Sequence, residues 1–198
     1  ISVVGPEALD DERQMQEAAA RLAIDIGGAN QMGCSSSRVT FVLTGPREDG
    51  VERVTALGRR VYDAIMGLPP TFSTMPKSYS KELKSHVDAL RHDDEWYEVI
   101  GGERGEGAII VSKLPRQVDF AAYLADRTAN LVPCESIDDI LLGMLEDRFS
   151  RDDTKAGFIL DGYPRNLVQA AALGQLLSKL GQKFDFAAAH RLHNPALS

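Results

Sequence analysis

The sequence has 198 residues, of which 43% are hydrophobic and 26% charged, and its formal net charge is −7. This length and composition are typical of a globular chain that buries a full core. The negative charge argues against nucleic acid and anionic membranes as partners, and no apolar run approaches the roughly 20 residues that span a bilayer. Cys34 and Cys134 lie far apart without metal-ligand spacing, so we expect no disulfide framework, no metal centre and an intracellular location, cytoplasmic or organellar.

The first half of the chain predicts alternating strands and helices. Residues 1–4 and the β-branched run 39–43 are typical of strands, whereas 10–24 and 51–66 carry apolar residues at helical spacing. The polar segment 33–37 between them is the only candidate linker in this half. Ile1 in place of an initiator methionine predicts a processed chain or a fragment.

The segment from Gly45 to Gly50 joins a predicted strand to a predicted helix, which is the setting of a phosphate-binding loop. Amide groups at the helix start attract anions, but no lysine follows to reach a phosphate chain. Glu48, Asp49 and Glu52 would repel a triphosphate. We therefore favour a structural turn here over an anion site.

The middle of the chain is polar. Residues 92–95 read His-Asp-Asp-Glu, but the side chains of a contiguous run do not converge on a metal without a special turn. Residues 101–107 are rich in glycine and predict a mobile loop or an insertion. A basic helix, expected on a solvated face, carries Lys77, Lys81 and Lys84.

Residues 108–111 predict another buried strand, followed by a segment that contains Lys113 and Arg116. A helix is expected to run from there through Phe120, Tyr123 and Leu124. This junction is a second candidate phosphate loop, with Lys113 as its cation, although no glycine lies between strand and helix.

The most informative stretch is the turn that begins at Asp161. Phe158–Leu160 is a short apolar run, typical of a strand buried on both faces of a parallel sheet. Asp161 and Arg165 would then follow the carboxyl end of a strand, where open α/β sheets bind ligands. Arg165 offers a planar fork for phosphate, and Gln169 lies one helical turn further on. The alternative is an ordinary turn with a capping aspartate and a solvated arginine.

The string Asp161-Gly162-Tyr163-Pro164-Arg165, followed by three residues and then Gln169, resembles the nucleoside monophosphate kinases, adenylate kinase above all. That family carries Asp-Gly-Phe/Tyr-Pro-Arg, three residues, and then Asn or Gln. Asn130–Pro133 looks like the family segment that lines the monophosphate pocket, and the resemblance covers about residues 130–190. A helix over 136–149 and a turn over 153–157 follow in family order.

The resemblance implies a nucleotide site. By it, Arg165 binds the phosphate of AMP, Gln169 the base, and Asp161 orders water around Mg²⁺. The other nucleotide-binding positions that it implies are Gly162, Tyr163, Val132, Thr74 (in a segment resembling the strand beside the adenine) and Gly45 (at the family's phosphate loop). The family's loop reads Gly, four residues, then Gly-Lys-Ser/Thr, and this chain lacks that lysine.

The fold implied is a three-layer α/β/α domain with a mainly parallel sheet, like adenylate kinase with a degenerate phosphate loop. Further strands are expected at 157–160 and 184–192. We expect residues 1–37 to form a strand–helix extension and 38–198 the kinase-like domain, with an insertion near 85–107. The family's arginine-bearing lid would follow the last strand, but the sequence stops at Ser198.

Two functions are compatible with this pattern. The first is a non-catalytic structural or nucleotide-sensing subunit that keeps the AMP site and has protein partners. The second is an active nucleoside monophosphate kinase, which uses ATP and Mg²⁺, if the sequence is a fragment or Lys113 replaces the missing lysine.

Overall fold

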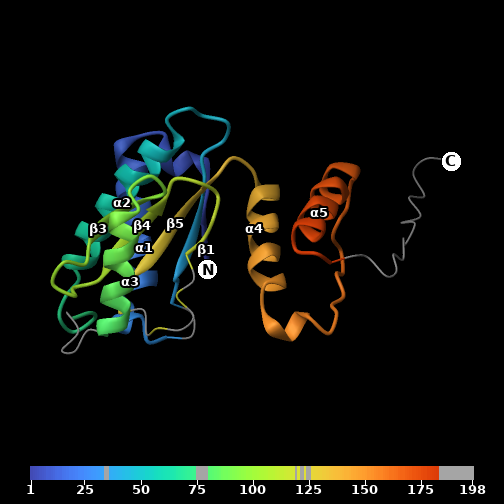
Figure 1. Ribbon diagram of the computed structural model, residues 1–198. Helices are drawn as coiled ribbons and strands as arrows, with labels where there is room; N and C mark the ends of the chain where they lie inside the picture. The colour runs from blue at the N-terminus through green and yellow to red at the C-terminus, as the bar shows by residue number, and fades with distance from the viewer. Residues whose placement is uncertain (34–35, 75–79, 119, 121–122, 124–125, 183–198) are drawn as a thin grey trace. The chain divides into compact units, whose positions relative to one another are not determined.

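Five strands of the described residues form one sheet in the order β1-β2-β5-β4-β3 (Figure 1). β1, β2, β5 and β4 pair in parallel, and β3 pairs with β4 in the antiparallel sense. The strands span Ser2–Val4 (β1), Val39–Leu43 (β2), Tyr97–Gly101 (β3), Ala108–Ser112 (β4) and Ala129–Cys134 (β5).

The computed structural model describes residues 1–33, 36–74, 80–118, 120, 123 and 126–182. They fall into two compact units, Ile1–Gly143 and Met144–Ser198. Within the described ranges the helices are Glu12–Gly27 (α1), Gly50–Met66 (α2), Lys81–His92 (α3), Ile137–Phe149 (α4) and Leu167–Lys179 (α5), with short 3-10 turns at Pro6–Leu9, Gly28–Gln31 and Asp152–Thr154. No described helix is long and apolar enough to cross a membrane.

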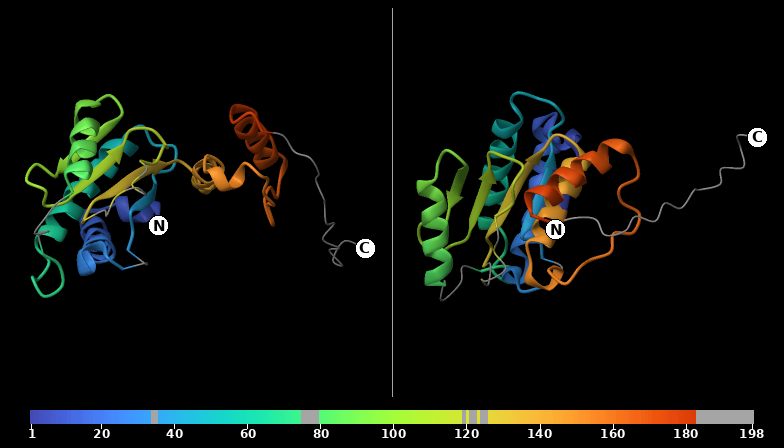
Figure 2. Two further views of the ribbon diagram at one scale, coloured as in Figure 1. Left: turned by 60° about the horizontal axis from the view of Figure 1, so that its bottom comes forward. Right: turned by 45° about the vertical axis from the view of Figure 1, so that its right-hand side comes forward.

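One face of the sheet packs on α1 and α2. Their apolar stripes, which include Leu22 and Leu57, meet the alternate strand residues Val42, Ile109 and Leu131 in one buried cluster. In the left view of Figure 2, α1 (blue) and α2 (teal) lie on one side of the sheet and α3 (green) on the other. This alternation of side chains across the strands places half of each strand's residues in either core.

The opposite face of the sheet is covered in two places. Leu83 and Val87 of α3 pack on Ile110 of β4, and Ile140 of α4 packs beside Phe41. Helices therefore cover both faces of a mainly parallel sheet, which confirms the predicted three-layer α/β/α architecture.

The predicted strands at 1–4, 39–43 and 108–111 are confirmed as β1, β2 and β4. The sequence did not indicate β5 as a strand, because Asn130 is polar and Pro133 has no amide hydrogen to donate to a neighbouring strand. It also did not indicate β3, an edge strand that is half-buried along its whole length. Residues 101–107 were predicted to be a mobile loop or insertion; Gly101 instead ends β3, and residues 102–107 connect β3 to β4 as a hairpin.

The buried strand predicted at 157–160 is wrong. These residues have no regular structure, and the Ile159 side chain is 94% exposed. A strand needs a neighbour for its backbone groups, and the described part of the second unit contains no strand to provide one. Phe158 instead stacks on Phe149, with ring centroids 4.1 Å apart. The strand predicted at 184–192 lies outside the described residues.

The helix predicted beyond Arg116 is also wrong over the residues that can be assessed. Phe120 and Tyr123 are not helical, and Leu124 lies outside the described residues. The carbonyl oxygens of Phe120 and Tyr123 accept from Arg38 Nη1 at 3.3 and 3.1 Å, and the Phe120 carbonyl also accepts from the Tyr123 amide in a turn.

Residues 1–37 share their core with the residues that follow them. β1 pairs with β2, and α1 packs on α2 within one hydrophobic cluster. The predicted boundary at residue 37, as a division between an extension and a kinase-like part, stays a prediction.

Candidate functional site

The turn that begins at Asp161 is tied to the start of α5 by side-chain caps. Asn166 caps the helix, since its Oδ1 accepts from the Gln169 amide at 2.8 Å. In return, Gln169 Oε1 accepts from the Arg165 amide at 2.8 Å. This reciprocal pair resembles a capping box and fixes where the chain enters the helix. The side-chain oxygen predicted to read a base is thus engaged by the backbone in this structure.

Arg165 folds back on the same turn. Its Nε donates to the Gly162 carbonyl at 2.6 Å, while the side chain as a whole remains exposed. Gly162 has a φ of 72°, a left-handed conformation that favours glycine. A Cβ at Gly162 would lie 3.2 Å from Arg165 Nη2. The structure therefore brings three predicted residues, Gly162, Arg165 and Gln169, into one turn.

Asp161 and Tyr163 flank Gly162 in this turn. The Asp161 side chain is exposed, and Tyr163 is half-buried and joined to Pro164 by a cis peptide bond. Asp161 follows irregular backbone. The prediction that it follows the carboxyl end of a sheet strand is therefore wrong. An exposed turn with a guanidinium group remains suited to bind a phosphate.

The loop after β2, which begins near Gly45, is where the resemblance places a triphosphate. Both nearby arginines are paired with carboxylates: Arg47 Nη2 lies 2.9 Å from Asp10 Oδ1, and Arg53 Nε lies 2.6 Å from Asp49 Oδ2. The hydrogen bond from Arg53 lowers the pKa of Asp49 below its ordinary value. The Arg47 amide donates to the Gly45 carbonyl at 2.8 Å, which closes the turn on itself.

Two further acids are exposed here: Glu48 in the same loop and Glu52 in the first turn of α2. Both arginines of this segment are held by carboxylates, so neither is placed to meet a triphosphate in this structure.

The remaining predicted residues all belong to the first unit and lie apart from one another. Val132 is fully buried in β5, packed in the cluster with Phe41. Thr74 is held by Asn30, whose Oδ1 accepts from the Thr74 amide at 2.7 Å, before the start of β2. Gly45 follows the end of β2, whereas Asn30, the partner of Thr74, precedes its start. Their roles in nucleotide binding stay predictions.

Lys113 follows β4, at the carboxyl end of a parallel strand. Its Nζ donates to the Asp94 carbonyl, so the ammonium is anchored to the turn before β3. In the described part of the chain, no three His, Cys, Asp or Glu side chains gather in a way that could hold a metal ion.

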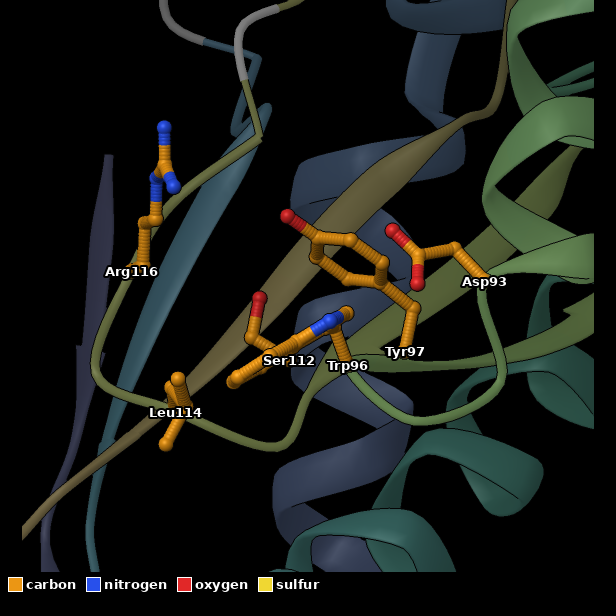
Figure 3. Close-up of a pocket in the computed structure, with 6 residues that line it drawn as sticks. All are labelled: Asp93, Trp96, Tyr97, Ser112, Leu114 and Arg116. Carbon is orange, nitrogen blue, oxygen red and sulfur yellow. The ribbon is translucent and has the colours of Figure 1, made fainter.

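Sequence reasoning missed a pocket of about 280 Å³ beside Lys113 (Figure 3). Six residues line it: Asp93, Trp96, Tyr97, Ser112, Leu114 and Arg116. Two signals could have indicated it: Ser112 ends a buried strand, and Trp96 is the only tryptophan in the chain.

No family model matches the chain. Curated relatives match over a segment of 48 residues, which is 24% of this chain and 26% of each relative. Over that segment the chain is 65% identical to an adenylate kinase of Xanthomonas euvesicatoria, 67% to one of Xanthomonas oryzae and 62% to one of Stenotrophomonas maltophilia. The chain therefore covers about a quarter of the length of these relatives.

The fold and these relatives define a class of protein. The mainly parallel sheet, covered by helices on both faces, is consistent with the α/β fold of a P-loop kinase. Over a segment of 48 residues this chain is similar to adenylate kinases.

Proposed function

We propose that this chain is an adenylate-kinase-like protein that binds AMP at the turn Asp161–Gln169 and serves as a non-catalytic structural or nucleotide-sensing subunit. The observation that carries the proposal is the hydrogen bond from Arg165 Nε to the Gly162 carbonyl. This bond orients the guanidinium at an exposed turn, in a chain that matches adenylate kinases at 62–67% identity over 48 residues.

In this proposal Arg165 holds the phosphate of AMP. A guanidinium has five N–H donors, and only Nε is used by the turn, so the others remain to meet phosphate oxygens. Gly162 gives the phosphate room, because a side chain there would crowd the Arg165 Nη2. Asp161 lies three residues before the cis-proline Pro164 and would order water if a metal-bound nucleotide came close.

Gln169 would recognise the base. Its Oε1 is engaged by the Arg165 amide, so pairing with a base edge requires this cap to be released or shared. Binding of AMP and capping of α5 are therefore coupled, and a sensing role follows naturally from this coupling.

The non-catalytic part of the proposal is supported by the loop after β2. Phosphoryl transfer needs positioned cations around the transferring group. Asp49 pairs with Arg53 and Arg47 with Asp10, so neither arginine is placed to serve a triphosphate. A chain with this loop is expected to prefer a monophosphate over ATP.

The second candidate is an active nucleoside monophosphate kinase with ATP and Mg²⁺ as its partners. It is favoured by the high identity of the matched segment and by Lys113, a lysine at the carboxyl end of β4. In this structure the Lys113 Nζ is bound to the Asp94 carbonyl, so it would have to change partners to act on a phosphate.

Titration calorimetry with AMP and with ATP tests the proposal. We expect measurable heat of binding with AMP and weaker binding with ATP, both in the presence of Mg²⁺. Tighter binding of ATP would overturn our interpretation of the loop from Gly45 to Glu52, and absence of AMP binding would overturn the proposed function.

A further inference from the structure

The pocket at the end of β4 is independent of the turn that carries the proposed AMP site. It lies wholly within the first unit, where Ser112 closes β4 and Tyr97 opens β3. Open α/β sheets bind ligands outside the carboxyl ends of their parallel strands, and Ser112 stands at such an end. The volume of about 280 Å³ is close to the lower end of the ~300–1,000 Å³ typical of small-molecule sites.

Ser112 is the buried polar group of this pocket, and its hydrogen-bonding role is fixed by Asn130. The Asn130 Oδ1 accepts from the Val118 amide at 2.9 Å, so the other end of this side chain must be its amide nitrogen. That nitrogen donates to Ser112 Oγ at 3.0 Å and to the Ile110 carbonyl at 3.0 Å. Because Ser112 Oγ already accepts from Asn130, its own proton is left to donate to a ligand.

Two charged groups line the same pocket without partners. The Arg116 guanidinium and the Asp93 carboxylate form no hydrogen bond or ion pair with the residues that the structure describes. In Figure 3 the Arg116 guanidinium and the hydroxyls of Tyr97 and Ser112 point to one side of the pocket. The Asp93 carboxylate lies beside the opposite edge of the Tyr97 ring (Figure 3). The pocket is thus positive at one end and negative at the other.

The walls of the pocket are apolar and flat. Trp96 is 41% exposed and Leu114 is 46% exposed, values that are high for large apolar side chains. An indole face and a phenol ring are the surfaces on which planar rings stack. Burial of these faces would follow if a ring entered the pocket.

We propose that this pocket binds a small planar ring that carries an anionic group at one end and an N–H donor at the other. Arg116 pairs with the anion, Ser112 donates to an acceptor on the ring, and Asp93 accepts from its N–H group. Trp96 and Leu114 cover the ring. Such chemistry is found in a pyrimidine mononucleotide and in an aminopyridine carboxylate, and experiment can separate the two.

Trp96 lines the pocket and is the only tryptophan of the chain, so the tryptophan fluorescence of the protein reports on this site. The full chain is titrated with cytidine 5′-monophosphate and, separately, with 6-aminonicotinate, and N-acetyltryptophanamide corrects for absorption by the probe. We expect a saturable change in Trp96 fluorescence with at least one probe. A response to the first alone assigns a mononucleotide, and a response to the second alone assigns an aromatic carboxylate.

Matched variants identify the groups involved. Arg116→Gln, at an exposed position, should weaken binding about tenfold or more, as expected for loss of a charged hydrogen bond. Arg13→Gln removes another exposed arginine, from α1, and should change nothing. Arg165→Ala should also leave the Trp96 signal intact, which separates this site from the proposed AMP site.

Two results would overturn the inference. One is the absence of a saturable Trp96 response to either probe at millimolar concentration. The other is unchanged affinity in Arg116→Gln, with far-ultraviolet circular dichroism showing that the variant is folded.

Discussion

Arg165 Nε donates to the Gly162 carbonyl at 2.6 Å, so the guanidinium and the glycine of the turn are a single structural unit. The Arg165 amide donates to a residue later in the chain, to Gln169 Oε1. Backbone and side chain of one arginine thus join the turn to the start of α5. A phosphate that competes for the guanidinium would also affect the cap of this helix.

Replacement of Arg165 by alanine tests the phosphate role directly. We expect Arg165→Ala to weaken AMP binding by about 1.5–3 kcal/mol, the scale of a hydrogen bond to a charged group. The free energy of unfolding should change little, since an exposed arginine contributes little to stability. Calorimetry and urea unfolding measure the two effects. Arg151→Ala, which removes an exposed arginine paired with Asp147, is the control, and equal AMP affinity in both variants would leave only a structural turn.

Asn130 is predicted to hold the centre of the first unit together. It is fully buried, and its side chain satisfies the Val118 amide, the Ile110 carbonyl and Ser112 Oγ at once. Asn130→Ala should lower the free energy of unfolding by about 3 kcal/mol, because several buried groups lose their partner. Urea unfolding followed by circular dichroism measures the loss. Gln16→Ala on the exposed face of α1 should cost less than about 0.5 kcal/mol, and a similar small loss for Asn130→Ala would disprove the role.

The hydrogen bond between Tyr62 and Glu106 makes the free energy of unfolding depend on pH in the alkaline range. The Tyr62 hydroxyl donates to Glu106 Oε1 at 3.0 Å, and burial together with this carboxylate raises the pKa of Tyr62 to about 12. The unfolded chain loses the phenol proton near the ordinary pKa of 10.0, before the folded chain does, so this contribution to stability is full below that pH. It is then lost as the pH rises from there through about 12.

Tyr62→Phe isolates this effect. At about pH 8 the variant should be less stable by about 1 kcal/mol, because it lacks the hydrogen bond to Glu106. At about pH 11 the difference from the original chain should shrink, because only the original chain has a phenol whose ionisation favours the unfolded state. Urea midpoints at both pH values provide the comparison. A difference that stays constant with pH would show that Tyr62 does not titrate as described.

Gly107 and Gly45 form a matched pair for backbone strain. Gly107 has a φ of 104°, and a Cβ there would lie 2.6 Å from the Arg127 carbonyl oxygen. Gly45 has a φ of 65° with nothing within 4 Å of its Cβ position. We expect Gly45→Ala to cost about 1–2 kcal/mol from the left-handed conformation alone, and Gly107→Ala to cost clearly more because its clash is with backbone. Equal melting temperatures for the two variants would contradict this.

The sequence predicted the fold class from its apolar pattern, and this worked where an apolar run is β-branched and followed by a helical pattern, as at 39–43. It failed at β5, because Pro133 argues against a central strand and yet lies opposite Val42 in the sheet. It also failed at 157–160, where an apolar run that resembles a buried strand leaves Ile159 exposed. Periodicity alone does not show whether a strand has a neighbour.

The two candidate sites differ in how much of each could be predicted from the sequence. The turn at Asp161 was found from a motif of contiguous residues, and the structure added only its capping bonds. The pocket was not predicted, because Asp93 and Arg116 come from segments on either side of a hairpin. Their proximity depends on the antiparallel register of β3 and β4, which pairs Tyr97 with Ser112. No spacing rule indicates that register in advance.

The most direct measurement of the central claim is ADP formation by the purified chain in the presence of ATP, Mg²⁺ and AMP. We predict no ADP above background, because the transition state spreads negative charge over the transferring group and the loop after β2 meets it with Glu48, Asp49 and Glu52. Sustained ADP formation would contradict a non-catalytic subunit. If that activity were lost in Lys113→Ala, the chain would be a kinase whose phosphate-binding lysine follows β4.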